Sequence, residues 1–194
     1  MKLIAAVDKN WAIGYKNQLL VQIPEDMQRF KNLTQNHVVF MGKNTLLSLP
    51  NASPLPNRRN IVLTSDKEFK AERTAIVHSI EEALREFEKY PSDEIYIIGG
   101  ASVYNQFLPY VKEALITYIQ YKYIADAWFP RLDDKMEWEM KKASEEFDYC
   151  GIKYQFREYI RKENSQRLLC NQSKTDCADC PNHATSACAD CPNK

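Results

Sequence analysis

The sequence has no excess of charge of either sign, because its 26 lysines and arginines balance 26 aspartates and glutamates. A formal net charge of zero argues against a nucleic-acid-binding protein that works through bulk charge. No apolar run approaches the roughly 20 residues that a membrane-spanning helix needs. No signal peptide is evident, because the short apolar run at the N-terminus meets a charge at Asp8. These absences predict a cytoplasmic protein that binds neither membranes nor nucleic acid.

Two common nucleotide-binding motifs are also missing. The chain contains no Gly-x-Gly-x-x-Gly sequence and no Gly-Lys-Ser/Thr loop of the Walker type. Neither a standard Rossmann domain nor a P-loop is therefore predicted. The 194 residues are enough for one domain with a sizeable core and an appendage.

The order of apolar and amphipathic segments predicts an α/β fold. Strand-like runs alternate with helix-like stretches, which favours a largely parallel central sheet. Ser79 with Glu82 three residues later is typical of a helix start. After Pro109 three strand-like segments follow one another, and they predict an antiparallel addition to the sheet. The expected strands are 3–7, 38–41, 61–63, 75–77, 95–98, 114–121, 137–143 and 152–160, and the expected helices are 24–33, 43–49, 79–89 and 101–107.

The composition changes near residue 165, where Asn, Asp, Ser, Ala and Cys replace the residues that could form a core. The hexapeptide Cys-Ala-Asp-Cys-Pro-Asn occurs twice, at 177–182 and 188–193. We therefore predict a catalytic domain over residues 1–162 and a separate Cys-rich tail over 163–194.

The tail contains two Cys-x-x-Cys pairs, whose spacing is typical of zinc or iron chelation. Seven residues separate the pairs, fewer than in the usual zinc ribbon. A disordered thiol-rich tail and redox-active pairs are the alternatives, with Cys170 and His183 as additional candidate ligands. The candidate metal ligands are Cys177, Cys180, Cys188 and Cys191.

Three unusual segments follow predicted strands, where open α/β sheets bind ligands. Gly42-Lys43-Asn44-Thr45 begins a helix, and backbone amides at such a position favour phosphate. Thr64-Ser65 supplies hydroxyls, and Gly99-Gly100 permits a close approach of the backbone to a ligand. Each signal alone is weak, since a glycine after a strand is usually only part of a turn. Together they predict a site for a phosphate-bearing cofactor.

Asp26 lies at the edge of an apolar helix face formed by Ile23, Met27 and Phe30. Pro24 suits the first turn of that helix. The ordinary interpretation of Asp26 is a first-turn acid that the helix dipole stabilises. The functional interpretation is a site acid that meets a ligand cation or hydrogen-bond donor, because a carboxylate beside an apolar face is otherwise costly.

Residues 1 to about 161 resemble dihydrofolate reductase, and the matching segments keep the family's order and spacing. The resemblance implies a three-layer α/β/α fold with a mixed, mainly parallel central sheet and a C-terminal antiparallel hairpin. It also implies a monomeric enzyme that reduces 7,8-dihydrofolate to tetrahydrofolate with NADPH, in folate and one-carbon metabolism. The matching segments are Leu3-Ile4-Ala5-Ala6, Ala12-Ile13-Gly14, Ile23-Pro24-Glu25-Asp26, Phe30, Met41-Gly42-Lys43-Asn44-Thr45, Pro54-Leu55-Pro56-Asn57-Arg58-Arg59-Asn60 and Ile97-Ile98-Gly99-Gly100-Ala101-Ser102-Val103-Tyr104.

The resemblance implies that Asp26 is the catalytic acid and faces the pteridine ring. Its carboxylate would accept hydrogen bonds from N3 and the 2-amino group and raise the basicity of N5, while water delivers the proton. We predict a raised pKa for Asp26 in the ligand-free protein, because its pocket is apolar. Arg58 would bind the glutamate α-carboxylate, although a solvated arginine after a turn is the ordinary alternative. The implied substrate residues are Ile4, Ala6, Met27, Phe30, Leu49, Leu55, Arg58, Ile98 and Thr117, of which the apolar ones are otherwise plain core.

The resemblance also implies an NADPH site in which Lys43 and Ser65 contact the 2′-phosphate. We expect no acid where an NAD-selective site would have one, and a cis peptide bond between Gly99 and Gly100. The loop 9–23 resembles the family's lid, and Val21 stands where many members have an indole that helps to hold a water. The implied cofactor residues are Ala6, Ile13, Gly14, Gly42, Lys43, Asn44, Thr45, Leu63, Thr64, Ser65, Gly99, Gly100, Ala101, Ser102, Val103 and Tyr104.

Two other functions remain as hypotheses. One is the fold-related NADPH reductase of riboflavin synthesis, which lacks the helix acid in the context Ile-Pro-Glu-Asp. The other is a non-catalytic module that presents a metal-binding tail to a partner. The lid, the acid and the cofactor segments are all present in this chain, and they favour the enzyme.

Overall fold

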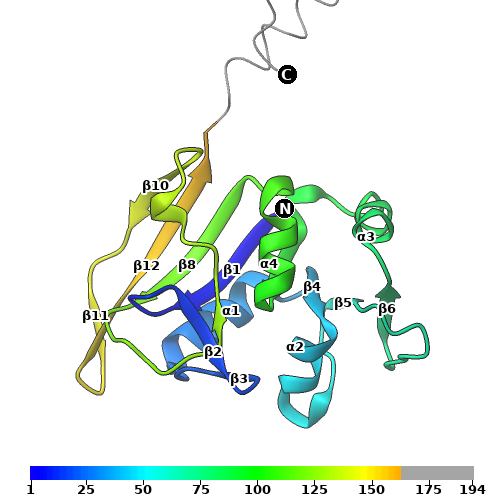
Figure 1. Ribbon diagram of the computed structural model, residues 1–194, viewed down its shortest axis with the longest axis horizontal. Coiled ribbons are helices and arrows are strands. Elements are labelled where there is room, and N and C mark those ends of the chain that lie inside the picture. Colours follow the sequence, from blue (N-terminus) through cyan, green and yellow to red (C-terminus); the bar gives the residue numbers. More distant parts are fainter. Residues whose placement is uncertain (163–194) are drawn as a thin grey trace, which may run out of the picture. The chain divides into compact units, whose positions relative to one another are not determined.

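The computed structural model describes residues 1–162, which form a twisted sheet with helices on both faces (Figure 1). The strands of the main sheet follow the order β10-β12-β8-β1-β7-β4-β5-β6, and β11 pairs with β12. The strands are β1 (Lys2–Val7), β4 (Val38–Gly42), β5 (Arg59–Leu63), β6 (Thr74–Val77), β7 (Ile95–Gly99), β8 (Glu113–Ile119), β10 (Trp138–Ala143), β11 (Phe147–Tyr149) and β12 (Ile152–Arg161).

The central strands are parallel, as the alternation of strand-like and helix-like segments predicts. β1 pairs in parallel with both β7 and β8, and β4 pairs in parallel with β5 and β7. β12 pairs antiparallel with β8, β10 and β11. The prediction of a mixed, mainly parallel sheet with an antiparallel C-terminal addition is therefore confirmed.

The central strands β4 and β7 are buried on both faces, whereas the edge strand β10 is mostly exposed. Consecutive residues of a strand point to opposite sides, so each central strand packs against both helical layers. The fully buried Leu3, Phe40 and Ile61 pack against Phe87 and Phe107. These two rings come from α3 (Ile80–Phe87) and α4 (Ala101–Phe107). One helical layer is thus formed by α3 and α4, and α4 crosses in front of the sheet in Figure 1.

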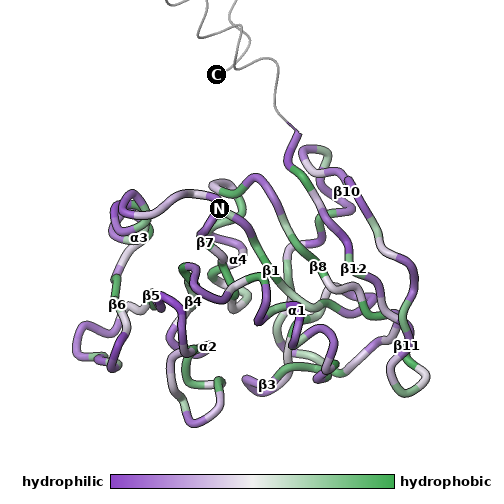
Figure 2. Tube along the Cα trace, turned by 180° about the vertical axis from the view of Figure 1, so that it is seen from behind, coloured by the Kyte–Doolittle hydropathy of each residue, from purple (hydrophilic) through white to green (hydrophobic). Residues whose placement is uncertain are grey.

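The opposite face carries α1 (Pro24–Thr34) and α2 (Lys43–Ser48). Phe30 of α1 packs against Ile4, and Leu46 of α2 packs against Met41 and Val62. In Figure 2, which views the molecule from behind, β1 is coloured as hydrophobic and α1 lies in front of the sheet. The three-layer α/β/α arrangement is confirmed.

The start of α3 follows the expected capping pattern with one difference. Ser79 precedes the helix, and its hydroxyl accepts a hydrogen bond from the Glu82 amide at 3.2 Å. The Glu82 carboxylate accepts from the amide of His78 rather than from that of Ser79. The side chain of Glu82 therefore satisfies an amide one residue before the cap.

A second, small sheet was not predicted. It consists of β2 (Ala12–Tyr15), β3 (Gln18–Leu19) and β9 (Ala127–Trp128), in the order β3-β2-β9. All three strands are too short to show a period of two. This sheet contains the lid segment and joins it to the loop after β8. Within residues 1–162 no helix has both the length and the apolar character that a membrane crossing requires.

Candidate functional site

A cavity of about 1400 Å³ lies at the carboxyl ends of β1, β4, β5 and β7. All but two of the predicted substrate and cofactor residues line this one cavity. Thr117 and Gly99 are the exceptions, and each contacts a residue that does line it. The main sheet thus brings together segments that are up to a hundred residues apart in the chain.

Asp26 reaches the cavity from the first turn of α1 and meets Thr117 of β8. The Thr117 hydroxyl, which is buried, donates a hydrogen bond of 2.5 Å to Asp26 Oδ1. Burial raises the pKa of Asp26 above its ordinary value, although the Thr117 hydrogen bond and the positive charge of Arg29 oppose the shift. The predicted raised pKa is confirmed. A carboxyl group held in this way can accept two donors from a ligand on its open side.

The raised pKa of Asp26 predicts how the folding stability of the protein depends on pH. Because the pKa of Asp26 lies above its unfolded value of 3.8, the folded state holds the proton more tightly than the unfolded chain. The protonated carboxyl group therefore contributes its full stabilisation below pH 3.8. This contribution is lost as the pH rises through the folded-state pKa of Asp26. Asp26→Asn should therefore raise Tm relative to the wild type at neutral pH, and the difference should shrink in acid. A variant that is less stable than the wild type at neutral pH would contradict this account.

Arg58 lies at the end of the cavity next to α1. Its Nε donates to Thr34 Oγ1 at 2.8 Å, and its Nη1 donates to the carbonyl of Pro56 at 3.0 Å. The guanidinium also lies 5.8 Å from the ring centre of Phe30. These contacts fix the orientation of the side chain, which is half-buried at the edge of the cavity.

Apolar side chains form the wall between Asp26 and Arg58. Phe30 and Ile98 pack against Ile4, and Leu49 and Leu55 pack against the cluster of β4 and β5. Val21 also lines the cavity. A valine side chain has no donor, so it cannot supply the hydrogen bond that an indole would give at this position.

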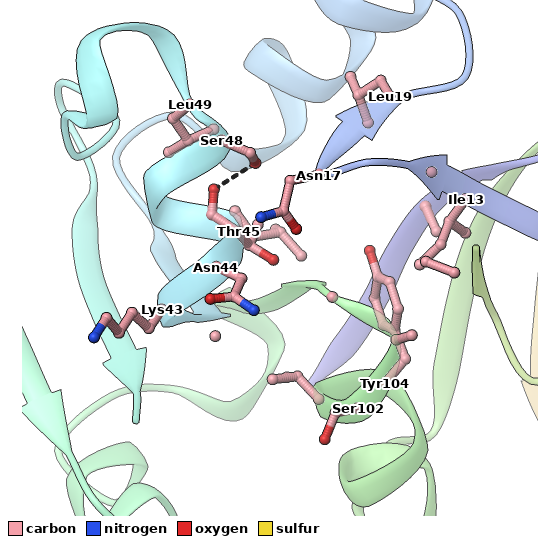
Figure 3. Close-up of a pocket in the computed structure, with 18 of the residues that line it drawn as sticks. Ile13, Asn17, Leu19, Lys43, Asn44, Thr45, Ser48, Leu49, Ser102 and Tyr104 are labelled. Atoms are coloured by element: carbon pink, nitrogen blue, oxygen red, sulfur yellow. Dashed lines mark hydrogen bonds between the residues drawn. The ribbon is translucent and has the colours of Figure 1, made fainter. Parts of the chain in front are cut away.

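The glycine pair at the end of β7 places backbone without side chains against α2 and α4. The peptide bond between Gly99 and Gly100 is cis, as predicted. A Cβ on Gly100 would lie 3.3 Å from Thr45 Oγ1. Tyr104 of α4 donates its hydroxyl to the carbonyl of Ile4 at 2.7 Å. Figure 3 shows Tyr104 and Ile13 on one side of the pocket, with Thr45 and Asn44 across from them.

Gly99 should tolerate no side chain. Its φ of +115° is unfavourable for an L residue, and an added Cβ would lie 3.0 Å from the Tyr104 ring. Gly151 is a matched control, because its φ is +79° but no atom lies within 4 Å of the added Cβ. We expect Gly151→Ala to cost about 1–2 kcal/mol of unfolding free energy, and Gly99→Ala roughly 1–3 kcal/mol more. Urea denaturation measures both, and equal costs would show that the Tyr104 contact is unimportant.

The structure adds one residue, Asp66, to the cofactor end of the cavity. Lys43 Nζ lies 2.7 Å from Asp66 Oδ2, and both residues line the cavity. Sequence analysis named Lys43 and Ser65 as contacts of the 2′-phosphate and did not name Asp66. Asp66 directly follows Ser65, so its position in the chain was the signal that could have found it.

The lid is held by two carboxylates that sequence reasoning also missed. Asp8 is fully buried and accepts hydrogen bonds from the amides of Asn10, Ala12 and Tyr123 at 2.7–2.9 Å. Asp126 accepts from the amide of Lys16 at 2.9 Å. These contacts join the lid to the loop after β8, and they leave Ile13 and Gly14 facing the cavity.

The four candidate metal ligands in the tail, Cys177, Cys180, Cys188 and Cys191, lie outside the described residues. Within residues 1–162 no group of three or more His, Cys, Asp or Glu side chains is arranged to hold a metal ion.

Comparison with known proteins gives a consistent result. A family model described as dihydrofolate reductase matches residues 1–161. Dihydrofolate reductase of Staphylococcus haemolyticus is 38% identical over 145 residues, which cover 74% of this chain and 85% of that protein. Dihydrofolate reductase of Bacillus subtilis (strain 168) is 31% identical over 168 residues, which cover 86% of this chain and 97% of that protein.

A solved structure agrees in fold. Dihydrofolate reductase from Enterococcus faecalis, complexed with NADP(H) and RAB-propyl, superposes with a TM-score of 0.75 at 28% identity. The match covers 84% of this chain and 96% of that one.

Proposed function

The chain belongs to the dihydrofolate reductase family, and we propose from this membership that it reduces 7,8-dihydrofolate to 5,6,7,8-tetrahydrofolate with NADPH. The observation that carries the proposal is the half-buried carboxyl group of Asp26, which faces the cavity and is held by Thr117. A pteridine edge that donates two hydrogen bonds would satisfy this group.

Dihydrofolate fits the half of the cavity between α1 and the sheet. Asp26 binds the amide and 2-amino edge of the pteridine, and its negative charge favours a proton at N5. The apolar side chains Ile4, Phe30 and Ile98 cover the ring faces and exclude water. Arg58 binds the α-carboxylate of the glutamate, for which a guanidinium offers paired donors.

NADPH fits the other half, where the described residues offer a cation, hydroxyls and bare backbone. Lys43 and Ser65 hold the 2′-phosphate, and Thr45 with Gly100 lines the path of the diphosphate. Ala6 and Ile13 cover the nicotinamide. When bound there, NADPH supplies the hydride that reduces C6 of the pteridine. The residues around it orient the reacting groups and keep water away from them.

The proposal is tested by mixing the purified full chain with dihydrofolate and following the loss of NADPH absorbance. Consumption of NADPH that requires dihydrofolate and is blocked by methotrexate is the expected result. Dihydrofolate-independent consumption, or none, would contradict the proposal. A riboflavin-pathway substrate serves as the comparison, and we expect no turnover with it.

We further propose that the catalytic domain covers residues 1–162 and acts as a monomer in the cytoplasm, without nucleic acid or membrane partners. The match to the family over residues 1–161 and the balanced charge support this proposal. For the tail, we propose that its two Cys-x-x-Cys pairs bind zinc or iron. Metal analysis of the protein with and without the last 30 or so residues tests this, and equal metal content would contradict it.

A further inference from the structure

The ion pair between Lys43 and Asp66 lies at the exposed rim of the cavity, at the end that the proposed function gives to the 2′-phosphate. Three lysines and arginines of the described residues line this cavity, namely Lys31, Lys43 and Arg58. Lys31 belongs to α1, and Arg58 donates a hydrogen bond to Thr34 of the same helix. Both cations therefore lie at the substrate end of the cavity. Lys43 is therefore the cation available to a phosphate beside β4 and β5, and it already has an anionic partner.

Asp66 is held in place by its own loop. Its Oδ1 accepts a hydrogen bond from the amide of Glu68 at 3.0 Å, and its amide donates to Thr64 Oγ1 at 3.1 Å. The Lys43 hydrogen bond and the Glu68 amide together hold the pKa of Asp66 below its ordinary value, so its carboxylate is charged at neutral pH.

Lys43 is held on two sides. Besides its contact with Asp66, its Nζ lies 4.8 Å from the ring centre of Phe69. The side chain points outward from the start of α2, away from Tyr104 and Ile13 (Figure 3). A phosphate that binds Lys43 must therefore approach a cation whose charge is already partly neutralised.

We propose that Asp66 limits the discrimination of this enzyme between NADPH and NADH, because its carboxylate competes with the 2′-phosphate for Lys43. The phosphate carries up to two negative charges, so a phosphate that binds Lys43 is repelled by the neighbouring carboxylate of Asp66. The 2′-hydroxyl of NADH is neutral and donates a hydrogen bond, so Asp66 does not repel it. A carboxylate near ribose hydroxyls is the device with which NAD-selective sites favour NADH.

This inference rests on the proposed function, and it is tested by binding as well as by turnover. Titration calorimetry of the full chain with NADP⁺ and with NAD⁺ gives two dissociation constants without any reaction. Asp66→Asn keeps the size of the side chain and removes its charge. We expect this variant to bind NADP⁺ about three- to fivefold more tightly, the range for an exposed charge pair, with no gain in affinity for NAD⁺.

Glu68→Gln is the matched control, because it removes one negative charge from the same loop at a side chain that does not line the cavity. Equal gains for NADP⁺ in Asp66→Asn and Glu68→Gln would overturn the inference, as would equal gains for NADP⁺ and NAD⁺ in Asp66→Asn. The ratio of kcat/KM for NADPH to that for NADH should rise by the same factor. If the wild type binds both cofactors but reduces no dihydrofolate, the proposed reaction is contradicted. The calorimetry of Asp66→Asn would still test the inference, because it needs no reaction.

Discussion

Asp26→Asn should lower kcat with dihydrofolate about a hundredfold at neutral pH, and the loss should become much smaller in acid. The asparagine keeps the size of the side chain and can still accept the Thr117 hydroxyl, so the pocket keeps its shape. What disappears is the negative charge that favours a proton on the pteridine. In acid the solvent supplies that proton more readily, and the charge matters less.

The control for this experiment is Glu25→Gln. Glu25 is the neighbouring acid in the first turn of α1, it is exposed, and it does not line the cavity. This variant should keep the kcat and the pH profile of the wild type. If the loss in Asp26→Asn is the same at every pH, the carboxylate has a structural role and no part in protonation.

Arg58→Leu should raise KM for dihydrofolate roughly 10- to 100-fold, the range expected for lost hydrogen bonds to a charged group, with a smaller effect on kcat. Two of its guanidinium nitrogens are already fixed by Thr34 and Pro56. The remaining N–H donors of the guanidinium can therefore bind a carboxylate with little loss of side-chain entropy, which favours high affinity. The measurement is steady-state kinetics at saturating NADPH.

The neighbouring Arg59 is a close control. It is exposed and does not line the cavity. Its acidic partner is Glu86, whose Oε1 lies 3.9 Å from Arg59 Nη2. Arg59→Leu should leave KM unchanged. A dihydropterin without the glutamate provides a second check, because Arg58→Leu should not affect its KM. An equal rise in KM for both substrates would mean that Arg58 supports the pocket and does not contact the glutamate.

Much of the fold could be predicted because its strands are strongly apolar and its helices have clear boundaries. The helix predicted over 24–33 is observed as Pro24–Thr34, and Ser79 caps α3 as expected. The strands of the small sheet could not be predicted, because two to four residues carry no periodicity. Their pairing depends on the loop after β8, which lies more than a hundred residues further along the chain.

In the site, too, residues with a local sequence signature could be predicted, and residues defined by distant partners could not. Segments with their own signature, such as Gly99-Gly100 and the helix start at Asp26, were found from sequence. Asp8 and Asp66 were missed because their partners are distant or belong to other segments. Asp8 binds an amide 115 residues away, and Asp66 meets Lys43 from 23 residues away. The position of Asp66 next to Ser65 could have placed it near the site, but no local pattern predicts its pairing with Lys43 or that of Asp8 with Tyr123.

The position of β1 in the sheet has a consequence for synthesis on the ribosome. β1 is the first strand to be made, yet its partners are Tyr96–Ile97 on one side and Glu113–Tyr118 on the other. The middle of the sheet therefore cannot close until nearly three quarters of the domain has emerged. Until then an apolar strand remains unpaired, and nascent chains of intermediate length should depend on chaperones more than the finished protein does.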